Sequence, residues 1–168
     1  GGASEVWNVD FGKSALAIGA RNAALNRLDG PHFKCIREDF FPVVRQLAGL
    51  PIKGRARYRR PFQHFEKMSF DLVVLDPPRW AKSPFGAVDI VHDYAALFKP
   101  VLLLTEPGGV VLATNNAASV SKADWLEGLR RCACKAGRPL RSLDVLVPDE
   151  DFPSPDGEPP LKIAVCGV

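Results

Sequence analysis

The stretch FDLVVLDPPR, residues 70–79, decides the fold class of this chain. Residues 70–75 are apolar and β-branched at their centre, as expected of a strand that is buried on both faces of a sheet. Two prolines follow the carboxylate of Asp76 and prevent the strand from continuing. The stretch therefore predicts a buried strand that ends abruptly in a rigid polar turn.

The segments on either side of this strand alternate between strand and helix periodicity. Upstream, the pattern predicts strands at 5–10 and 32–37 and helices at 13–28 and 40–48. Downstream, it predicts a helix at 88–104 that is kinked or broken near Pro100, a strand at 109–114, a helix at 122–136, and closing strands at 140–147 and 161–166. The alternation indicates a single domain, residues 1–168, with a doubly wound, mostly parallel α/β sheet and an antiparallel C-terminal edge hairpin.

Composition supports a globular protein. Hydrophobic residues make up 46% of the 168 residues and charged residues 24%. No apolar run approaches the roughly 20 residues that cross a bilayer, and no signal-peptide pattern opens the chain, so we expect a cytoplasmic protein. The spacing of the four cysteines matches no zinc pattern, which predicts reduced thiols and no metal site.

Polar residues follow the predicted strands, at the edge where ligands bind in such sheets; they are Asp10, Glu38-Asp39, Asp76 and Asn115-Asn116. The carboxylate of Asp10 can accept both hydroxyls of an adenosine ribose, or it can simply cap the following helix. Asp39 can accept a hydrogen bond from an adenine amino group while Phe40 packs on the ring, or it can act as a helix-start acid. Spacing alone leaves these alternatives open.

The Asp76-Pro77-Pro78 turn is a more specific signal. A carboxylate on a rigid turn can hold a planar base or an amine by hydrogen bonds. The alternative is a plain loop in which the prolines only stop the strand.

A basic stretch lies between Asp39 and Glu66, where the sequence has no acidic residue. Its composition is that of a ribbon that contacts RNA phosphates, with Tyr58 available for stacking, although a solvated hairpin would have the same composition. The basic residues are Arg45, Lys53, Arg55, Arg57, Arg59 and Arg60.

Taken in order, the motifs resemble those of class I S-adenosylmethionine (SAM)-dependent methyltransferases. More narrowly, the chain resembles the bacterial family that methylates large-subunit ribosomal RNA and carries a DPP-[RK]-[FW] signature. The matching residues are Val9-Asp10, Ala15-Leu16, Arg21-Asn22, Leu25-Asn26, Asp39, Asp76-Pro77-Pro78-Arg79-Trp80 and Lys82, with Asp151-Phe152-Pro153 and Leu161-Lys162 near the end.

The resemblance implies a Rossmann-like fold, a SAM cofactor and a ribosomal RNA substrate. The cofactor would be held by Asp10, Phe11, Asp39, Phe40 and Asp76, and the target base by Asp76, Pro77, Pro78 and Asn116. The RNA backbone would be held by Arg55, Arg57, Arg59, Arg60, Arg79 and Lys82.

The first departure from the family concerns the methylated atom. Methylation at cytosine C5 requires a cysteine nucleophile, which normally follows the strand that ends here at Thr114. Asn115-Asn116 stands there instead, and no cysteine follows Pro77-Pro78. An asparagine pair resembles the guanine-N7 branch, in which a ring nitrogen attacks the methyl group directly, although asparagines are also common turn residues.

The second departure concerns the glycine-rich first strand of the family, which is expected directly upstream of Gly1-Gly2-Ala3. That strand would lie between the Asp10 strand and the Asp76 strand, so its absence predicts two half-sheets with unpaired edges. The chain is therefore interpreted as a partial methyltransferase domain that also lacks the family's small RNA-binding domain. Two alternatives remain: a catalytically inactive RNA- or cofactor-binding remnant, and a dinucleotide-dependent oxidoreductase that holds an NAD ribose on Asp10.

Overall fold

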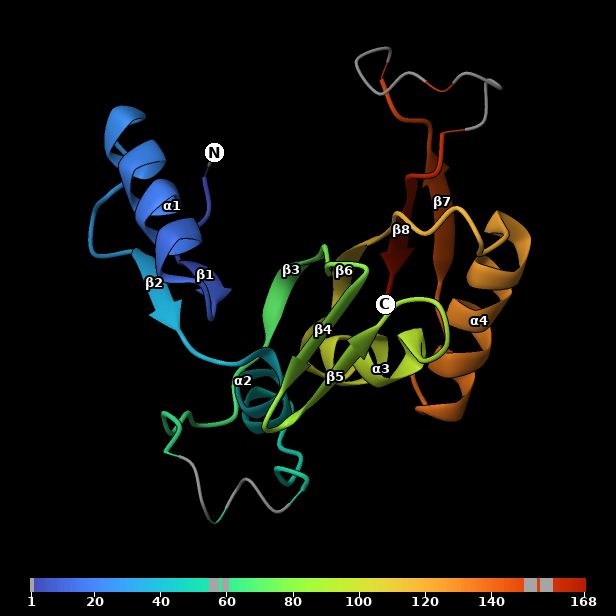
Figure 1. Ribbon diagram of the computed structural model, residues 1–168, viewed down its shortest axis with the longest axis horizontal. Coiled ribbons are helices and arrows are strands. Elements are labelled where there is room, and N and C mark those ends of the chain that lie inside the picture. The colour runs from blue at the N-terminus through green and yellow to red at the C-terminus, as the bar shows by residue number, and fades with distance from the viewer. Residues whose placement is uncertain (1, 55–57, 59–60, 150–153, 155–158) are drawn as a thin grey trace.

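The computed structural model describes residues 2–54, 58, 61–149, 154 and 159–168 (Figure 1). Strands and helices alternate along the first half of the chain and again towards its end. The elements are β1 (Val6–Asp10), α1 (Lys13–Leu25), β2 (Phe33–Arg37), α2 (Phe40–Leu47), β3 (Phe70–Leu75), β4 (Trp80–Ser83), β5 (Gly86–Asp89), α3 (Tyr94–Leu104), β6 (Thr105–Asn115), α4 (Lys122–Lys135), β7 (Ser142–Leu146) and β8 (Lys162–Gly167).

The main sheet has four strands in the order β3-β6-β8-β7. Strand β3 pairs with β6 in parallel, whereas β8 runs antiparallel to both β6 and β7. A second, two-stranded sheet consists of β1 and β2, which pair in parallel. The α/β class and the antiparallel edge are confirmed.

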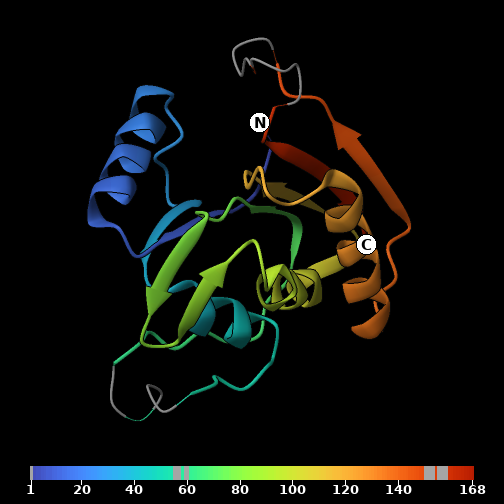
Figure 2. The same ribbon diagram turned by 45° about the vertical axis from the view of Figure 1, so that its right-hand side comes forward.

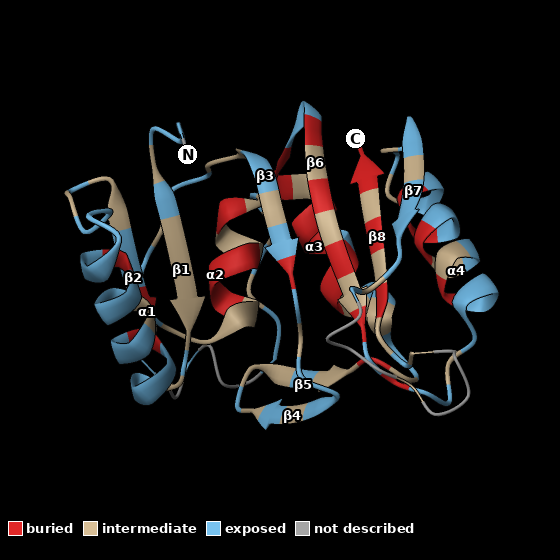
Figure 3. Ribbon diagram, turned by 90° about the horizontal axis from the view of Figure 1, so that it is seen from above, coloured by how far each residue is buried: buried red, intermediate tan, exposed pale blue. Residues whose placement is uncertain are grey.

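Helix α3 lies at the centre of the hydrophobic core. Its side chains Leu97, Phe98, Val101 and Leu102 are at most 1% exposed. The helix packs on β3 and β6 and contacts both α2 and α4, so one layer of helices covers one face of the four-stranded sheet (Figures 2 and 3).

The opposite face of β3 is open. Leu72 and Val74 are each 59% exposed, so the expectation that residues 70–75 are buried on both faces is wrong for this structure. The cause is that the described helices leave this face of β3 uncovered. Side chains alternate along a strand, and only the face that bears Val73 and Leu75 meets the core.

The two sheets lie in line without hydrogen bonds between them. Figure 3 shows β1 next to β3, with both arrows pointing the same way, yet the strands do not pair. Trp7 of β1 links the two parts, because its ring lies 5.7 Å from that of Phe65 and 5.6 Å from that of Phe70. The unpaired edges of β1 and β3 agree with the expected gap at this position.

Several boundaries differ from the predictions; helix α1, for example, ends at Leu25 rather than at 28. Residues 80–89, partly assigned to a helix from 88, form the antiparallel hairpin β4–β5, and Asp93 caps α3 by accepting from the N–H of Ala96. Helix α3 continues through Pro100 without a break. Strand β6 begins at Thr105 rather than at 109, and a Cβ added at Gly109 would lie 2.8 Å from the carbonyl oxygen of Asp71, so only glycine allows this close strand approach.

None of the described helices is both long enough and apolar enough to span a membrane.

Candidate active site

The turn after β3 meets the end of β6. Because Leu75 pairs with Ala113 in parallel register, the residues that follow each strand lie side by side. The hydroxyl of Thr114 donates to Asp76 Oδ1 at 2.5 Å, and the hydroxyl of Tyr94 donates to the carbonyl of Thr114 at 2.8 Å. Asp76 is exposed, so its carboxylate is oriented by Thr114 while it still faces solvent.

The two asparagines after β6 have different environments. Asn115 is 1% exposed; its Nδ2 donates to the carbonyl of Ile90 at 3.0 Å and its Oδ1 accepts from the N–H of Ala117 at 2.9 Å. Asn116 is exposed. Asn115 therefore fixes the conformation of the loop by its hydrogen bonds, whereas Asn116 is exposed to solvent.

Lys162 anchors the same loop from the other side. It is 7% exposed, and its Nζ donates to the carbonyls of Ala117 at 2.9 Å and Pro160 at 2.8 Å. Burial lowers the pKa of this ammonium group. The buried lysine is thus satisfied by backbone oxygens, and the antiparallel edge strand β8 helps to shape the loop that carries Asn116.

Asp10 and Asp39 form a second group, at the carboxyl ends of β1 and β2. Asp10 Oδ1 accepts from the N–H of Gly12 at 2.6 Å, and Asp39 Oδ1 accepts from the N–H of Phe41 at 2.9 Å as the N-cap of α2. Asp39 thus caps α2, whereas Asp10 holds only the turn before α1, whose N-cap is Gly12 and has no side-chain cap hydrogen bond. Each uses one oxygen in this way, and within the described residues the other oxygen accepts no hydrogen bond.

The aromatic residues beside these acids differ in packing. Phe11 is 66% exposed at the end of β1. Phe40 is partly buried and stacks edge-to-face on Phe41, with ring centroids 5.3 Å apart. An exposed ring at a strand end is free to cover a planar ligand, whereas a ring already packed on its neighbour is less so.

The residues expected to hold RNA are only partly described. Arg79 and Lys82 are exposed on and beside the β4–β5 hairpin. Of the basic stretch, Arg45 lies on α2, whereas four arginines fall outside the described residues, as does the Asp151-Phe152-Pro153 element; the four are Arg55, Arg57, Arg59 and Arg60.

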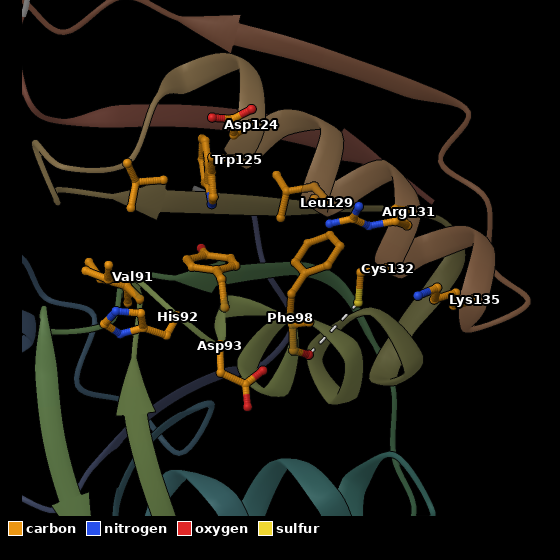
Figure 4. A pocket seen from close by; sticks show the side chains of 15 residues that line it. Val91, His92, Asp93, Phe98, Asp124, Trp125, Leu129, Arg131, Cys132 and Lys135 are labelled. Atoms are coloured by element: carbon orange, nitrogen blue, oxygen red, sulfur yellow. Dashed lines mark hydrogen bonds between the residues drawn. The ribbon is translucent and has the colours of Figure 1, made fainter.

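Sequence reasoning missed a cavity of about 370 Å³ between α3 and α4 (Figure 4). Trp125 lines it and packs edge-to-face on Tyr94 at 5.6 Å, and within the described part of the chain its buried indole N–H has no hydrogen-bond acceptor. Burial strongly raises the pKa of Tyr94. The cavity escaped notice because its residues follow ordinary helical core spacing, which carries no polar signal.

All four cysteines are free thiols, and two of them, Cys132 and Cys166, are buried. Burial raises the pKa of both and brings that of Cys166 to about 12, which keeps it from acting as a thiolate. Cys35 lies on β2 and Cys134 on α4. Within the described chain, the segments directly after β3 and directly after β6 therefore carry no thiol. No three His, Cys, Asp or Glu residues of the described ranges gather as a metal site would require.

The fold defines the class of protein first. A solved structure from Streptococcus mutans, described as a SAM-dependent methyltransferase, superposes with a TM-score of 0.72 and 20% identity over 100% of this chain and 39% of that one. The chain therefore has the Rossmann-like fold of these methyltransferases. No protein-family model matches it.

Sequence relatives narrow the class. Ribosomal RNA large subunit methyltransferase I of Aeromonas hydrophila is 31% identical over 153 residues, which are 91% of this chain and 34% of that protein. Ribosomal RNA large subunit methyltransferase K/L of Allochromatium vinosum is 30% identical over 118 residues, 69% of this chain and 14% of that protein. The chain is thus homologous to a part of these methyltransferases and spans about a third of the first and a seventh of the second.

Proposed function

We propose that the protein is a SAM-dependent methyltransferase that acts on a base of ribosomal RNA. The observation that carries the proposal is the 31% identity to ribosomal RNA large subunit methyltransferase I over 91% of the chain. The matched region includes the Asp76-Pro77-Pro78 turn at the end of β3. Since the chain spans only a third of that relative, the activity is proposed for the protein of which this fold forms a part.

The carboxyl edge of the β1–β2 sheet is the proposed adenosine site. Asp10 would accept the ribose hydroxyls and Asp39 the adenine amino group, each through the carboxylate oxygen that does not accept from the following backbone N–H. Phe11 and Phe40 would cover the adenine ring. SAM supplies an electrophilic methyl group on a sulfonium, and the protein's part is to hold that group in line with the target.

The turn Asp76-Pro77-Pro78 and the amide of Asn116 are proposed to hold the target base. A ring nitrogen, as in guanine N7, attacks a methyl group through its own lone pair, so the enzyme need only orient it. Cytosine C5 methylation would need a thiolate beside the base. The support for a ring nitrogen is that Asn115 ends β6 and Asn116 follows it, and that Cys132 and Cys166 are buried elsewhere.

A further parallel strand is proposed to fit between β1 and β3 and to complete the cofactor site. The support is that both strands point the same way and leave their facing edges unpaired (Figure 3). Unpaired edges leave backbone groups without partners, which is unfavourable in a sheet. The same observation favours the second candidate function, an inactive RNA- or cofactor-binding protein.

Two measurements test the proposal. Calorimetric titration with S-adenosylhomocysteine should show binding that Asp10→Ala abolishes and Asp10→Asn weakens less, because asparagine keeps an oxygen for the N–H of Gly12. Incubation with tritiated SAM and large-subunit rRNA, followed by nucleoside mass spectrometry, should give a methylated ring nitrogen. Binding without transfer would support the inactive alternative, 5-methylcytosine would refute the ring-nitrogen assignment, and failure of both would overturn the proposal.

A further inference from the structure

The side chain of Trp80 is unusually exposed for its type. It is 62% exposed at the start of β4, whereas Trp125 is 4% exposed and Trp7 is part of an aromatic cluster. Burying an indole is among the larger apolar contributions available to a fold. The indole of Trp80 is instead left open immediately after the Asp76-Pro77-Pro78 turn.

Trp80 forms one wall of an open hollow of about 700 Å³, which is the size of a small-molecule site. The hollow is built by the start of β4, the end of β5, the segment before α3 and the loop after β6. Its lining residues are Arg79, Trp80, Asp89, Val91, His92 and Ser119. The N–H of Ile90 donates to the carbonyl of Arg79, which fixes the hollow's two sides to each other.

The one carboxylate that lines the hollow is satisfied within the protein. Asp89 Oδ1 accepts from the backbone N–H groups of Val91 and His92, and its Oδ2 lies 2.9 Å from His92 Nδ1. These hydrogen bonds, above all the one from the His92 side chain, lower the pKa of Asp89. Because Nδ1 of His92 contacts Asp89, its Nε2 is the ring nitrogen that is available to a ligand.

The hairpin adds positive charge beside the indole. Side chains alternate along a strand, so Trp80 and Lys82 share one face of β4, and Arg79, the residue before Trp80, lines the same hollow. The nearest further acid along the chain is Asp76, four residues before Trp80, whose Oδ1 accepts from Thr114. A flat exposed ring flanked by cations has the chemistry of single-stranded nucleic acid recognition, in which aromatic side chains stack on bases and cations contact phosphates.

We infer that the hollow beside Trp80 is a subsite for a nucleobase of single-stranded RNA, next to the target base rather than the target base itself. Trp80 stacks on this base, Ser119 and His92 Nε2 meet its polar edge, and Arg79 and Lys82 contact the flanking phosphates. The inference rests on the proposed RNA substrate and adds a subsite to it.

The test is the affinity of the protein for a fluorescein-labelled, unstructured RNA 12-mer, measured by anisotropy over a range of salt concentrations. Trp80→Ala should weaken binding about 5- to 150-fold without changing the salt dependence, because stacking involves no ion release. Trp80→Phe should retain most of the affinity. Lys82→Gln should reduce the slope of log K against log salt by about 0.7, whereas Lys99→Gln, at an exposed lysine of α3 outside the hollow, should not.

Each outcome decides between the two proposals. The subsite is refuted if Trp80→Ala binds RNA as tightly as the unaltered protein, if Trp80→Ala and Lys82→Gln change the same quantity, or if the protein binds no RNA. Methyl transfer to rRNA is measured separately. If RNA binding depends on Trp80 but no methyl group is transferred, the subsite is upheld and the proposed function is refuted. If methyl transfer occurs at the same rate with and without Trp80, the proposed function is upheld and the subsite is refuted. Unchanged thermal unfolding of each variant excludes a folding defect.

Discussion

Replacing Asn115 by alanine should destabilise the protein, and replacing its neighbour Asn116 should not. Asn115 is 1% exposed and makes two hydrogen bonds, one to the carbonyl of Ile90 and one from the N–H of Ala117. Both partners belong to residues that are at most 1% exposed, so water cannot replace the lost amide without a rearrangement. Asn116 is exposed and has no comparable anchor.

The magnitude follows from the two groups left without a partner. A buried donor or acceptor that loses its partner costs about 1–3 kcal/mol, so the two groups together should make Asn115→Ala lower the free energy of unfolding by about 2–6 kcal/mol. Asn115→Asp keeps an acceptor for Ala117 but places a carboxylate against the carbonyl of Ile90, so it should be at least as destabilising. Asn116→Ala should change stability by no more than about 0.5 kcal/mol.

Urea unfolding followed by circular dichroism measures all three variants under one condition. The proposed methyl-transfer assay then separates the two roles: Asn116→Ala should lose at least about 10-fold in rate while it remains as stable as the unaltered protein. The reasoning is refuted if Asn115→Ala loses less than about 1 kcal/mol, or if Asn116→Ala loses as much as Asn115→Ala.

Three further predictions follow from buried side chains and from the contact between β3 and β6. Thr114→Val should lower methyl transfer because it releases the Asp76 carboxylate, and Thr114→Ser should restore it; equal rates for both would refute an orienting role. Lys162→Met should lower the free energy of unfolding by about 1–3 kcal/mol in urea, since the carbonyl of Ala117 loses its donor. Burial raises the pKa of Cys166 to about 12, so the unfolded thiol loses its proton first, and stability should fall between about pH 9 and 12 by an amount that Cys166→Ala removes.

The alternation of strands and helices was predictable from sequence because each element has a clear period and a clear stop. The hairpin at 80–89 was not, because its strands have four residues each and no alternating apolar pattern. A kink or break was predicted in helix α3 near Pro100, but the surrounding core holds that residue in the helix and the helix is not broken there. Tertiary packing overrode a local preference.

The placement of the candidate site residues at strand ends was predictable, but their individual environments were not. The sequence placed Asp76 and the asparagine pair at adjacent strand ends, and the structure joins them through Thr114. It could not distinguish Asn115 from Asn116, because their burial depends on Ile90 and Ala117, which no periodicity connects to them. The alternative that Asp10 caps the following helix is wrong, because α1 begins after Gly12 without a side-chain cap and Asp10 accepts only from the N–H of Gly12 in the turn before it.

The two halves of the candidate site, the Asp76 turn with the Asn116 loop and the strand end with Asp10, are held in place by different parts of the structure. The loop with Asn116 is fixed by Asn115 and by Lys162 of β8, and Asp76 is fixed by Thr114 of β6. These contacts all lie within the four-stranded sheet and its loops. Asp10, in contrast, lies on the small β1–β2 sheet, which no hydrogen bond joins to β3. The Asp76 turn and the Asn116 loop, which form the proposed base-binding half, are therefore held in place by contacts within this chain. The distance between them and Asp10, in the proposed cofactor-binding half, depends on what pairs with the open edges of β1 and β3. Loss of cofactor binding should accordingly leave the Asp76 turn and the proposed RNA contacts intact.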